Sequence, residues 1–336
     1  MRSPLRTARW AGPSPLLLAA TVLAFVVAPI VSGTGSVSAA DAPPDPRTPV
    51  AQVQEPEVTR SHERLPTRGG QLIQRRDVIG VATMNQFSRL TDSQAWSDAV
   101  ALTSQPDVDV VGWQESQHFA KVLAGLRNRG WESRRFPNGA RELAVSWRSS
   151  KFSYVKSTSR MVAEGIDGVS GRYPFSNRFI VRVTLKHKAT GRLLSVINTH
   201  LPQKSEDLGN PGHWDDTYNA AKARTQLQAL RQEWRRTPGR WVVGTGDYNF
   251  DFRADVRAKL PSAPFRALGQ VARSSYDVLG GRDVRQTHPP TGRRIDYVFA
   301  ARSGLRSGAI KFLGQRTLPG LNSDHLPLLV RLALRS

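Results

Sequence analysis

Residues 241–249 read Trp241-Val242-Val243-Gly244-Thr245-Gly246-Asp247-Tyr248-Asn249, an apolar run that ends in a polar cluster. The apolar part, Trp241–Val243, has the valine-rich character of a buried β-strand. Directly beyond it, Asp247 and Asn249 provide a carboxylate and an amide. A strand that ends in this way brings reactive side chains to the edge of a sheet, where binding and catalytic groups are usually placed.

The same pattern recurs along the chain. The predicted strands with polar residues at or beside one end are 78–84 with Asn85, 108–111 with Gln114-Glu115, 193–197 with Asn198-Thr199-His200, 295–299 with Asp296, and 326–332 after Ser323-Asp324-His325. Further strands are predicted at 131–136, 143–147, 152–155 and 179–185, and helices at 93–103, 119–126 and 217–235. Packing alone does not require polar strand ends, so we expect them to converge on one rim of a layered sheet protein.

The excess of basic residues indicates what kind of molecule the protein binds. The 336 residues include 48 basic and 27 acidic side chains, a formal net charge of +21. This balance favours a polyanionic partner, such as nucleic acid or an anionic membrane surface, although a coding preference for arginine would also produce it. The chain has no cysteine. Disulfide scaffolds, thiolate zinc or iron–sulfur sites and a cysteine nucleophile are therefore excluded.

The first 40 residues have the features of an export signal. Three arginines precede an apolar run, Leu16–Val31, and small residues then lead to a cleavage context at Val37-Ser38-Ala39-Ala40. The run is short for a membrane span and contains Pro29, so a retained anchor is the weaker alternative. We therefore predict a signal peptide over residues 1–40 and a secreted protein.

A proline-rich segment follows the predicted signal. Residues 41–76 contain few large apolar side chains and begin with Asp41-Ala42-Pro43-Pro44-Asp45-Pro46. Such a segment cannot bury enough apolar surface to offset the entropy lost on ordering, so we predict a disordered linker. The folded domain is predicted to span residues 77–336.

The polar strand ends suit chemistry on phosphate esters. Glu115, Asp247 and Asp324 offer hard oxygen ligands, which favour Mg²⁺, Mn²⁺ or Ca²⁺ over a structural zinc ion. Asn85 and Asn249 could bind a phosphate oxygen or orient a water molecule. These residue types together are typical of metal-assisted hydrolysis.

Two histidines complete this set of residues. His200 and His325 stand at strand ends, and an imidazole is suited to proton transfer near neutral pH. Asp296 could orient one of these rings and stabilise its protonated form. Each residue alone is weak evidence, but their order along successive strands indicates a site.

Six segments resemble the endonuclease/exonuclease/phosphatase superfamily, which includes deoxyribonucleases, abasic-site endonucleases, sphingomyelinases and inositol polyphosphate phosphatases. The matching segments are Thr83-Met84-Asn85, Trp113-Gln114-Glu115, Asn198-Thr199-His200-Leu201, Gly246-Asp247-Tyr248-Asn249, Ile295-Asp296-Tyr297-Val298 and Ser323-Asp324-His325. The resemblance implies an α/β fold: a four-layer α/β/β/α sandwich of two packed, mostly antiparallel sheets flanked by helices.

The resemblance also implies roles for single residues. Glu115 is similar to the principal metal ligand of the family, with Asn85 beside it and Asp324 in the same ligand group. Asp247 would orient or activate the attacking water, and Asn249 would hold the phosphate.

For the histidines, the resemblance implies that His325, oriented by Asp296, is the catalytic imidazole. His200 matches a second histidine found in the deoxyribonuclease-like and sphingomyelinase-like branches. Arg178 is similar in position to a phosphate-contacting residue, with an ordinary surface arginine as the alternative.

The substrate remains open within this family, because one fold serves many phosphate esters. The positive charge favours a nuclease of low sequence specificity, since neutralising backbone phosphates supplies most non-specific affinity. We also expect a monomer. Candidate phosphate contacts are Arg134-Arg135, Arg235-Arg236, Arg253 with Arg257, and Arg293-Arg294. The alternatives are a sphingomyelinase or phospholipase C, an inositol phosphate phosphoesterase, and a non-catalytic polyanion-binding module. A lipid-specific enzyme would need an apolar loop that enters the membrane interface, and the loop 205–216 has a single aromatic side chain, Trp214.

Overall fold

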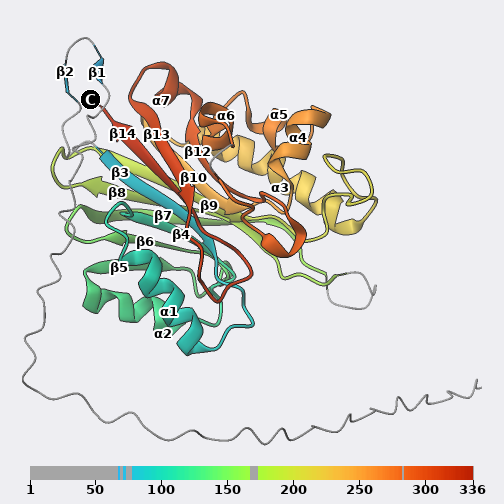
Figure 1. Ribbon diagram of the computed structural model, residues 1–336, viewed down its shortest axis with the longest axis horizontal. Coiled ribbons are helices and arrows are strands. Elements are labelled where there is room, and N and C mark those ends of the chain that lie inside the picture. The colour runs from blue at the N-terminus through green and yellow to red at the C-terminus, as the bar shows by residue number, and fades with distance from the viewer. Residues whose placement is uncertain (1–66, 69–70, 73–77, 167–172, 282–283, 336) are drawn as a thin grey trace, which may run out of the picture. The chain divides into compact units, whose positions relative to one another are not determined.

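The computed structural model describes residues 67–68, 71–72, 78–166, 173–281 and 284–335 (Figure 1). The predicted signal peptide, 1–40, and most of the predicted linker lie outside the described residues. Within the predicted linker, the short strands β1 (Thr67–Arg68) and β2 (Gln71–Leu72) pair antiparallel.

Two six-stranded sheets form the centre of the fold. The first has the order β13 (Ile310–Thr317), β14 (Leu328–Leu334), β3 (Val78–Asn85), β4 (Val110–Gln114), β6 (Ala144–Arg148) and β5 (Trp131–Arg135). The second has the order β11 (Ala272–Ser274), β12 (Asp296–Ala301), β10 (Trp241–Asp247), β9 (Leu193–His200), β8 (Arg178–His187) and β7 (Phe152–Ala163). Only β3/β4 and β9/β10 are parallel neighbours, so both sheets are mostly antiparallel and the predicted sandwich is confirmed.

Alternate side chains of the strands in the first sheet pack into two different hydrophobic cores. In β3 and β4, Val81 and Val110 face the core between the sheets, whereas Ala82 and Val111 face the opposite core, under helix α1 (Asp92–Thr103) and helix α2 (Ala120–Gly125). Successive strand residues point to opposite faces, so apolar pairs of this kind require a sheet covered on both sides.

The second sheet has its own helical layer. Helix α3 (Tyr218–Arg236) begins at Thr217, whose side chain caps the helix by accepting from the Ala220 backbone N–H. Leu227 and Leu230 of this helix join the main core. The shorter helices α4 (Phe252–Ala258), α5 (Pro264–Leu268) and α6 (Ser275–Leu279) lie near α3, away from α1 and α2 (Figure 1).

The two sheets meet closely behind the polar strand ends. A Cβ at Gly112 in β4 would lie 1.9 Å from Oγ1 of Thr245 in β10, so only glycine fits this position. Asn198 of β9 crosses the same gap and donates to the backbone oxygens of Trp113 (2.8 Å) and Ala144 (3.0 Å). These contacts fix the alignment of the two sheets, and therefore the relative positions of the residues beyond their ends.

Some elements differ from the sequence predictions. Strand β7 continues to Ala163, well beyond the predicted 152–155, and β13 and helices α4–α6 were not predicted. A further helix, α7 (Arg302–Arg306), and two 3₁₀ turns, η2 (Leu126–Arg129) and η4 (Pro289–Thr291), complete the elements. Among the described helices, none combines the length and apolar character needed to cross a bilayer.

Candidate active site

The strand register of the second sheet brings three predicted residues together. Strands β9 and β10 run parallel, and their pairing places Asp247 opposite His200 at the common end. Strand β12 runs antiparallel to β10, so its first residue, Asp296, pairs with Asp247 from the other side. A carboxylate, an imidazole and a second carboxylate therefore lie side by side at one sheet edge.

The first sheet contributes a second group in the same manner. Parallel pairing of β3 and β4 sets Asn85 opposite Gln114, and Glu115 follows with a left-handed φ of 53°. This conformation is costly for a residue other than glycine and is concentrated at functional sites. The Glu115 carboxylate is held by Ser88, whose backbone N–H (2.9 Å) and hydroxyl (2.8 Å) both donate to Oε2.

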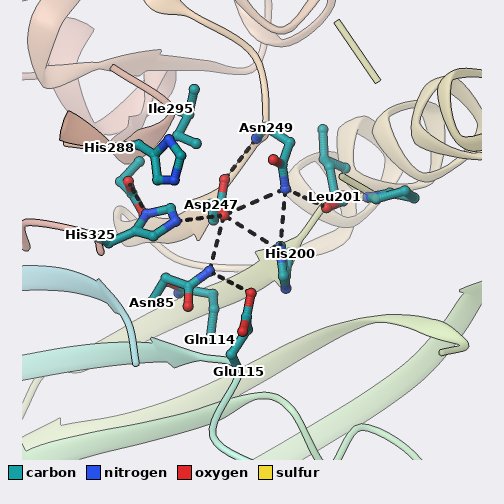
Figure 2. A network of polar contacts seen from close by, with 12 residues as sticks. Asn85, Gln114, Glu115, His200, Leu201, Asp247, Asn249, His288, Ile295 and His325 are labelled. Atoms are coloured by element: carbon teal, nitrogen blue, oxygen red, sulfur yellow. Dashed lines mark hydrogen bonds and ion pairs between the residues drawn. The ribbon is translucent and has the colours of Figure 1, made fainter. Parts of the chain in front are cut away.

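Asn85 joins the two sheets. Its Nδ2 donates to Glu115 Oε1 and to Asp247 Oδ2, each at 3.1 Å (Figure 2). Asn85 and Asp247 are each only 1% exposed, so these contacts are made away from bulk water. The Asn85 amide therefore links Glu115, the predicted metal ligand, to Asp247, the carboxylate predicted to orient the water.

Asp247 lies at the centre of the network (Figure 2). Its Oδ1 accepts from the Asn249 backbone N–H at 2.8 Å, while Oδ2 lies 3.4 Å from His200 Nε2 and 3.8 Å from His325 Nε2. Burial raises the pKa of Asp247, but the two imidazoles and the Asn249 N–H outweigh burial and hold that pKa well below its ordinary value. Asp247 is therefore an ionised acceptor at neutral pH.

His325 is paired with Asp296, as predicted. The distance from Nδ1 to Asp296 Oδ2 is 2.8 Å. Burial lowers the pKa of His325, but the charges of Asp296 and Asp247 and the hydrogen bond that Nδ1 donates to Asp296 outweigh burial and raise it to about 10. Burial also raises the pKa of Asp296, so one proton is held tightly between the two groups. His325 thus presents an N–H at Nε2 toward Asp247.

His200 has a partner that the sequence did not reveal, Glu142. The Glu142 carboxylate lies 3.2 Å from His200 Nδ1 and forms a buried ion pair with Arg178. Burial and the Arg178 charge lower the pKa of His200, but Glu142 and Asp247 outweigh them and raise it to about 9. Burial raises the pKa of Glu142, yet Arg178 and His200 together lower it to about 2. Both charged forms are therefore favoured at neutral pH.

Replacing Glu142 by glutamine is expected to destabilise the fold in a pH-dependent way. Removing one partner of a buried pair costs about 3 kcal/mol or more at pH 7. The pKa of Glu142 is lowered from 4.5 to about 2 on folding, so its stabilisation is complete above pH 4.5 and is lost as the pH falls toward 2. Urea unfolding of wild type and Glu142→Gln across this range measures the difference. A difference independent of pH would contradict the ion pair.

Arg178 is buried, 4% exposed, at the first position of β8. It contacts Glu142 and approaches Nδ1 of His200 at 3.3 Å, behind the imidazole that faces Asp247. The alternative of an ordinary surface arginine does not fit this position. Its contact with substrate phosphate stays a prediction.

Asp324 lies beside a second residue that the sequence analysis missed, His288. The distance from His288 Nε2 to Asp324 Oδ2 is 3.6 Å, and the ring centroids of His288 and His325 lie 4.7 Å apart. Figure 2 shows these two rings side by side. Among the described contacts, no hydrogen bond or ion pair joins Asp324 to Glu115 or Asn85. Asp324 lies beside His288 and directly precedes His325 in the chain, and its place in one ligand group with Glu115 stays a prediction.

The donor atoms fit a divalent metal ion. Ligand atoms of Asp247, Asp296 and His325 lie within 4.8 Å of one another, as do those of His288, Asp324 and His325. Buried carboxylate oxygens of Asp296 and Asp324 have no hydrogen-bond partner among the described residues. Unpartnered buried oxygens are costly, and a hard cation would satisfy them.

Comparison with known proteins identifies the family. Residues 84–325 match the Endonuclease/Exonuclease/phosphatase family. The chain belongs to this family. The matched range contains every site residue discussed above, so the protein is a phosphoesterase of the Endonuclease/Exonuclease/phosphatase family. No curated protein matches the sequence.

Solved structures with the same fold include enzymes of different specificity. Zebrafish (D. rerio) TDP2, complexed with a single-strand DNA product, is 14% identical, with a TM-score of 0.57 over 76% of this chain and 98% of that one. The human Nocturnin catalytic domain is 19% identical, with a TM-score of 0.51 over 77% and 96%. A mannosyl-6-phosphatase of Bacteroides thetaiotaomicron is 17% identical, with a TM-score of 0.50 over 76% and 99%. At these identities the likeness establishes the fold alone.

Proposed function

We propose that the protein is a secreted, divalent-metal-dependent phosphodiesterase that cleaves nucleic acid with low sequence specificity. The observation that carries this proposal is the buried network around Asp247, which Asn85, Asn249, His200 and His325 approach from four strand ends or the loops beside them. The network combines an ionised acceptor with two imidazoles whose pKa values are raised. That combination suits hydrolysis of a charged ester.

The residues that would hold Mg²⁺ are Glu115 and Asn85, as the family resemblance implies. Neither belongs to the two Asp/His groups described above, but Asn85 joins Glu115 to Asp247 of the first group. The Glu115 carboxylate and the Asn85 side-chain oxygen are hard donors, and Ser88 fixes the orientation of the carboxylate. Bound there, the ion supplies a Lewis acid that neutralises charge developing on the phosphate. Asp324 lies 3.6 Å from His288, and its charge contributes to the raised pKa of His325.

Asp247 and His325 would carry out the proton transfers. The Asp247 carboxylate accepts a hydrogen bond from the attacking water and directs its oxygen toward phosphorus. As the new P–O bond forms, the bond to the leaving oxygen breaks, and that oxygen takes the Nε2 proton of His325. The water proton passes to Asp247, 3.8 Å from His325 Nε2, from which the imidazole is protonated again.

His200 and Asn249 would bind the non-bridging phosphate oxygens. The Asn249 amide lies 3.3 Å from His200 Nε2 and is fixed by donation to the Leu201 backbone oxygen at 3.1 Å. The raised pKa of His200 keeps its ring cationic at neutral pH. A positioned cation and amide stabilise the extra negative charge of the transition state without reorganising.

Two observations favour nucleic acid over lipid. The net charge is +21, and +18 without the three arginines of residues 1–40, and it supplies the electrostatic attraction on which non-specific nucleic-acid binding depends. Trp214, the aromatic residue of the loop that would insert into a lipid surface, packs on Phe250 with ring centroids 4.7 Å apart, and its Nε1 donates to Ser262 Oγ. A side chain engaged in this way is not available as a membrane anchor.

A substrate panel tests the proposal. The full-length protein is incubated with plasmid DNA, RNA, sphingomyelin vesicles and inositol polyphosphate, each with Mg²⁺, Mn²⁺, Ca²⁺ or EDTA. We expect metal-dependent cleavage of DNA or RNA into fragments with no preferred end sequence. Release of choline phosphate alone would indicate a sphingomyelinase or phospholipase C. Release of inorganic phosphate alone would indicate an inositol phosphate phosphoesterase. Binding of DNA without cleavage of any substrate would indicate a non-catalytic module.

Secretion is proposed from residues 1–40 alone. Expression of the full chain in a bacterial host should yield protein in the periplasm or medium, with a new N-terminus close to Asp41. N-terminal sequencing of the recovered protein identifies the cleavage point. Retention of the intact N-terminus in the membrane fraction would support the anchor instead.

A further inference from the structure

A recess of about 640 Å³ opens on the outer side of the second sheet. Its lining comes from α3, the end of α4, α5, β11 and α7, and from the segments between them. The basic side chains that line it are Arg231, Lys259, Arg266, Arg273 and Arg302. Each of the five comes from a different element, so the concentration of charge is created by the fold and not by a run in the sequence.

Most cations of this recess, which we call the basic recess, form no ion pair with a described residue, although the Arg266 charge acts on the nearby Asp255 carboxylate. Asp277 is its one acidic lining residue, and this carboxylate is engaged by Arg273 at 2.5 Å. Among the described ion pairs, none involves Arg231, Lys259, Arg266 or Arg302, the other four cations. Among the described residues, Arg231 and Arg302 donate to neutral groups, the Gln270 side-chain oxygen and the Gly269 backbone oxygen.

The arginines that the sequence analysis proposed as phosphate contacts are, in part, used differently. Arg293 pairs with the buried Glu206 at 3.0 Å, and Arg294 donates to the Val284 backbone oxygen. Arg293 and Arg294 are thus engaged by groups within the protein. The recess cations that form no described ion pair contribute a part of the positive net charge that is available to a ligand.

Lys259 occupies an unusual backbone position. It ends α4 with a left-handed φ of 57°, where glycine is the favoured residue. Its side chain is exposed and makes no ion pair among the described residues. The sequence thus retains a charged side chain at the rim of the basic recess at a conformational cost.

The basic recess is separate from the candidate active site. Strand β12 begins at Asp296, in the catalytic network, and ends at Ala301, which pairs with Ala272 in β11 beside the recess. Five strand steps of about 3.4 Å separate these ends by about 17 Å. No residue that lines the recess belongs to the Asp247 network.

We propose that the basic recess is a second phosphate-binding site, which holds the backbone of a polynucleotide away from the scissile bond. Four cations that form no described ion pair line a concave wall and can contact successive phosphates of a flexible strand, whereas a bilayer presents a flat surface to protruding groups. The polynucleotide identity of the ligand rests on the proposed function, but the phosphate chemistry of the recess does not. Such a contact raises affinity for long substrates and leaves the bond-breaking step unchanged.

The test compares two triple variants of the full chain with equal loss of charge. The recess variant carries Lys259→Gln, Arg266→Gln and Arg302→Gln. The control variant carries Lys121→Gln, Arg127→Gln and Arg129→Gln, exposed residues of α2 and η2 in the other helical layer. Fluorescence anisotropy measures binding of a fluorescein-labelled oligothymidylate in EDTA, so that turnover does not contribute. Cosedimentation with phosphatidylglycerol vesicles measures lipid binding.

We expect the recess variant to bind the oligonucleotide about tenfold more weakly than wild type, with a slope of log affinity against log salt smaller by about 2. The control variant should change much less. An equal loss in both variants, or no oligonucleotide binding by wild type, would overturn the proposal. Loss of vesicle binding with unchanged oligonucleotide binding would assign the recess to lipid and also overturn it.

A separate readout distinguishes the recess from the catalytic proposal. Hydrolysis of bis(p-nitrophenyl) phosphate, which is too small to reach both sites, should be equal in wild type and the recess variant. Wild-type protein that binds oligonucleotide through the recess but cleaves neither DNA nor RNA would refute the nuclease function and leave the second site standing.

Discussion

Replacing His325 by alanine is expected to lower kcat on plasmid DNA by about 10³-fold, within the range that positioned acid–base groups contribute. The reason is the loss of the Nε2 proton donor, 3.8 Å from Asp247, that would protonate the leaving oxygen. Steady-state rates in Mg²⁺ measure the loss, and thermal unfolding checks that the variant remains folded. A folded His325→Ala protein with more than a tenth of wild-type activity would rule out this role.

The Asp296→Asn variant separates positioning from chemistry. Asp296 raises the pKa of His325, to about 10, so removing its charge should lower that pKa. Activity that needs the protonated imidazole is lost as pH rises through this pKa, and the basic limb of the pH–rate profile should therefore move to lower pH in the variant. A basic limb that stays in place would show that Asp296 does not act through His325.

Replacing Glu115 by glutamine is expected to raise the Mg²⁺ concentration for half-maximal activity by at least about tenfold. The substitution removes a charge but keeps the shape of the side chain, and Ser88 Oγ can still donate to the amide oxygen. A hard divalent cation loses affinity when a carboxylate ligand becomes neutral. Activity is measured as a function of Mg²⁺ concentration. Independently, Mn²⁺ binding is measured by electron paramagnetic resonance. Coinciding titrations of variant and wild type would contradict the ligand role.

Much of the site could be predicted because the relevant residues end apolar strands. Asn85, Glu115, His200 and Asp247 each follow a run of valine, isoleucine or other apolar side chains, and that contrast is visible in the sequence. The parallel pairs β3/β4 and β9/β10 then bring their ends together. The pairing itself is not visible in the sequence, because it depends on contacts between residues far apart in the chain.

Glu142 was missed because it stands in a charged stretch, next to Arg141, that resembles a solvated loop. A usable signal was present: Glu142 directly precedes the predicted strand 143–147, and an antiparallel strand starts at the edge where its neighbour ends. His288 offered no such signal, since it precedes the turn Pro289–Thr291. Only the folding of that turn beside Asp324 places its ring near His325.

The missed elements of the fold have a common cause, which is weak periodicity. The outer part of β7, from Lys156 to Arg160, is polar and exposed because β7 is an edge strand paired only with β8. Strand β13 contains a bulge between Phe312 and Gly314 that interrupts its alternation. Helices of five to seven residues, such as α5, are too short to show an apolar face.

Phosphodiester hydrolysis by the Asp247 network can be tested with a single substitution, Asp247→Asn. Full-length wild type and Asp247→Asn are each incubated with supercoiled plasmid in Mg²⁺ and in EDTA, and nicked product is measured over time. Asparagine keeps the size of the side chain but cannot accept the water proton. We expect wild type to nick the plasmid in Mg²⁺ but not in EDTA, and the variant to nick it at least about 10³-fold more slowly. Equal nicking by the two proteins, or nicking that persists in EDTA, would contradict it.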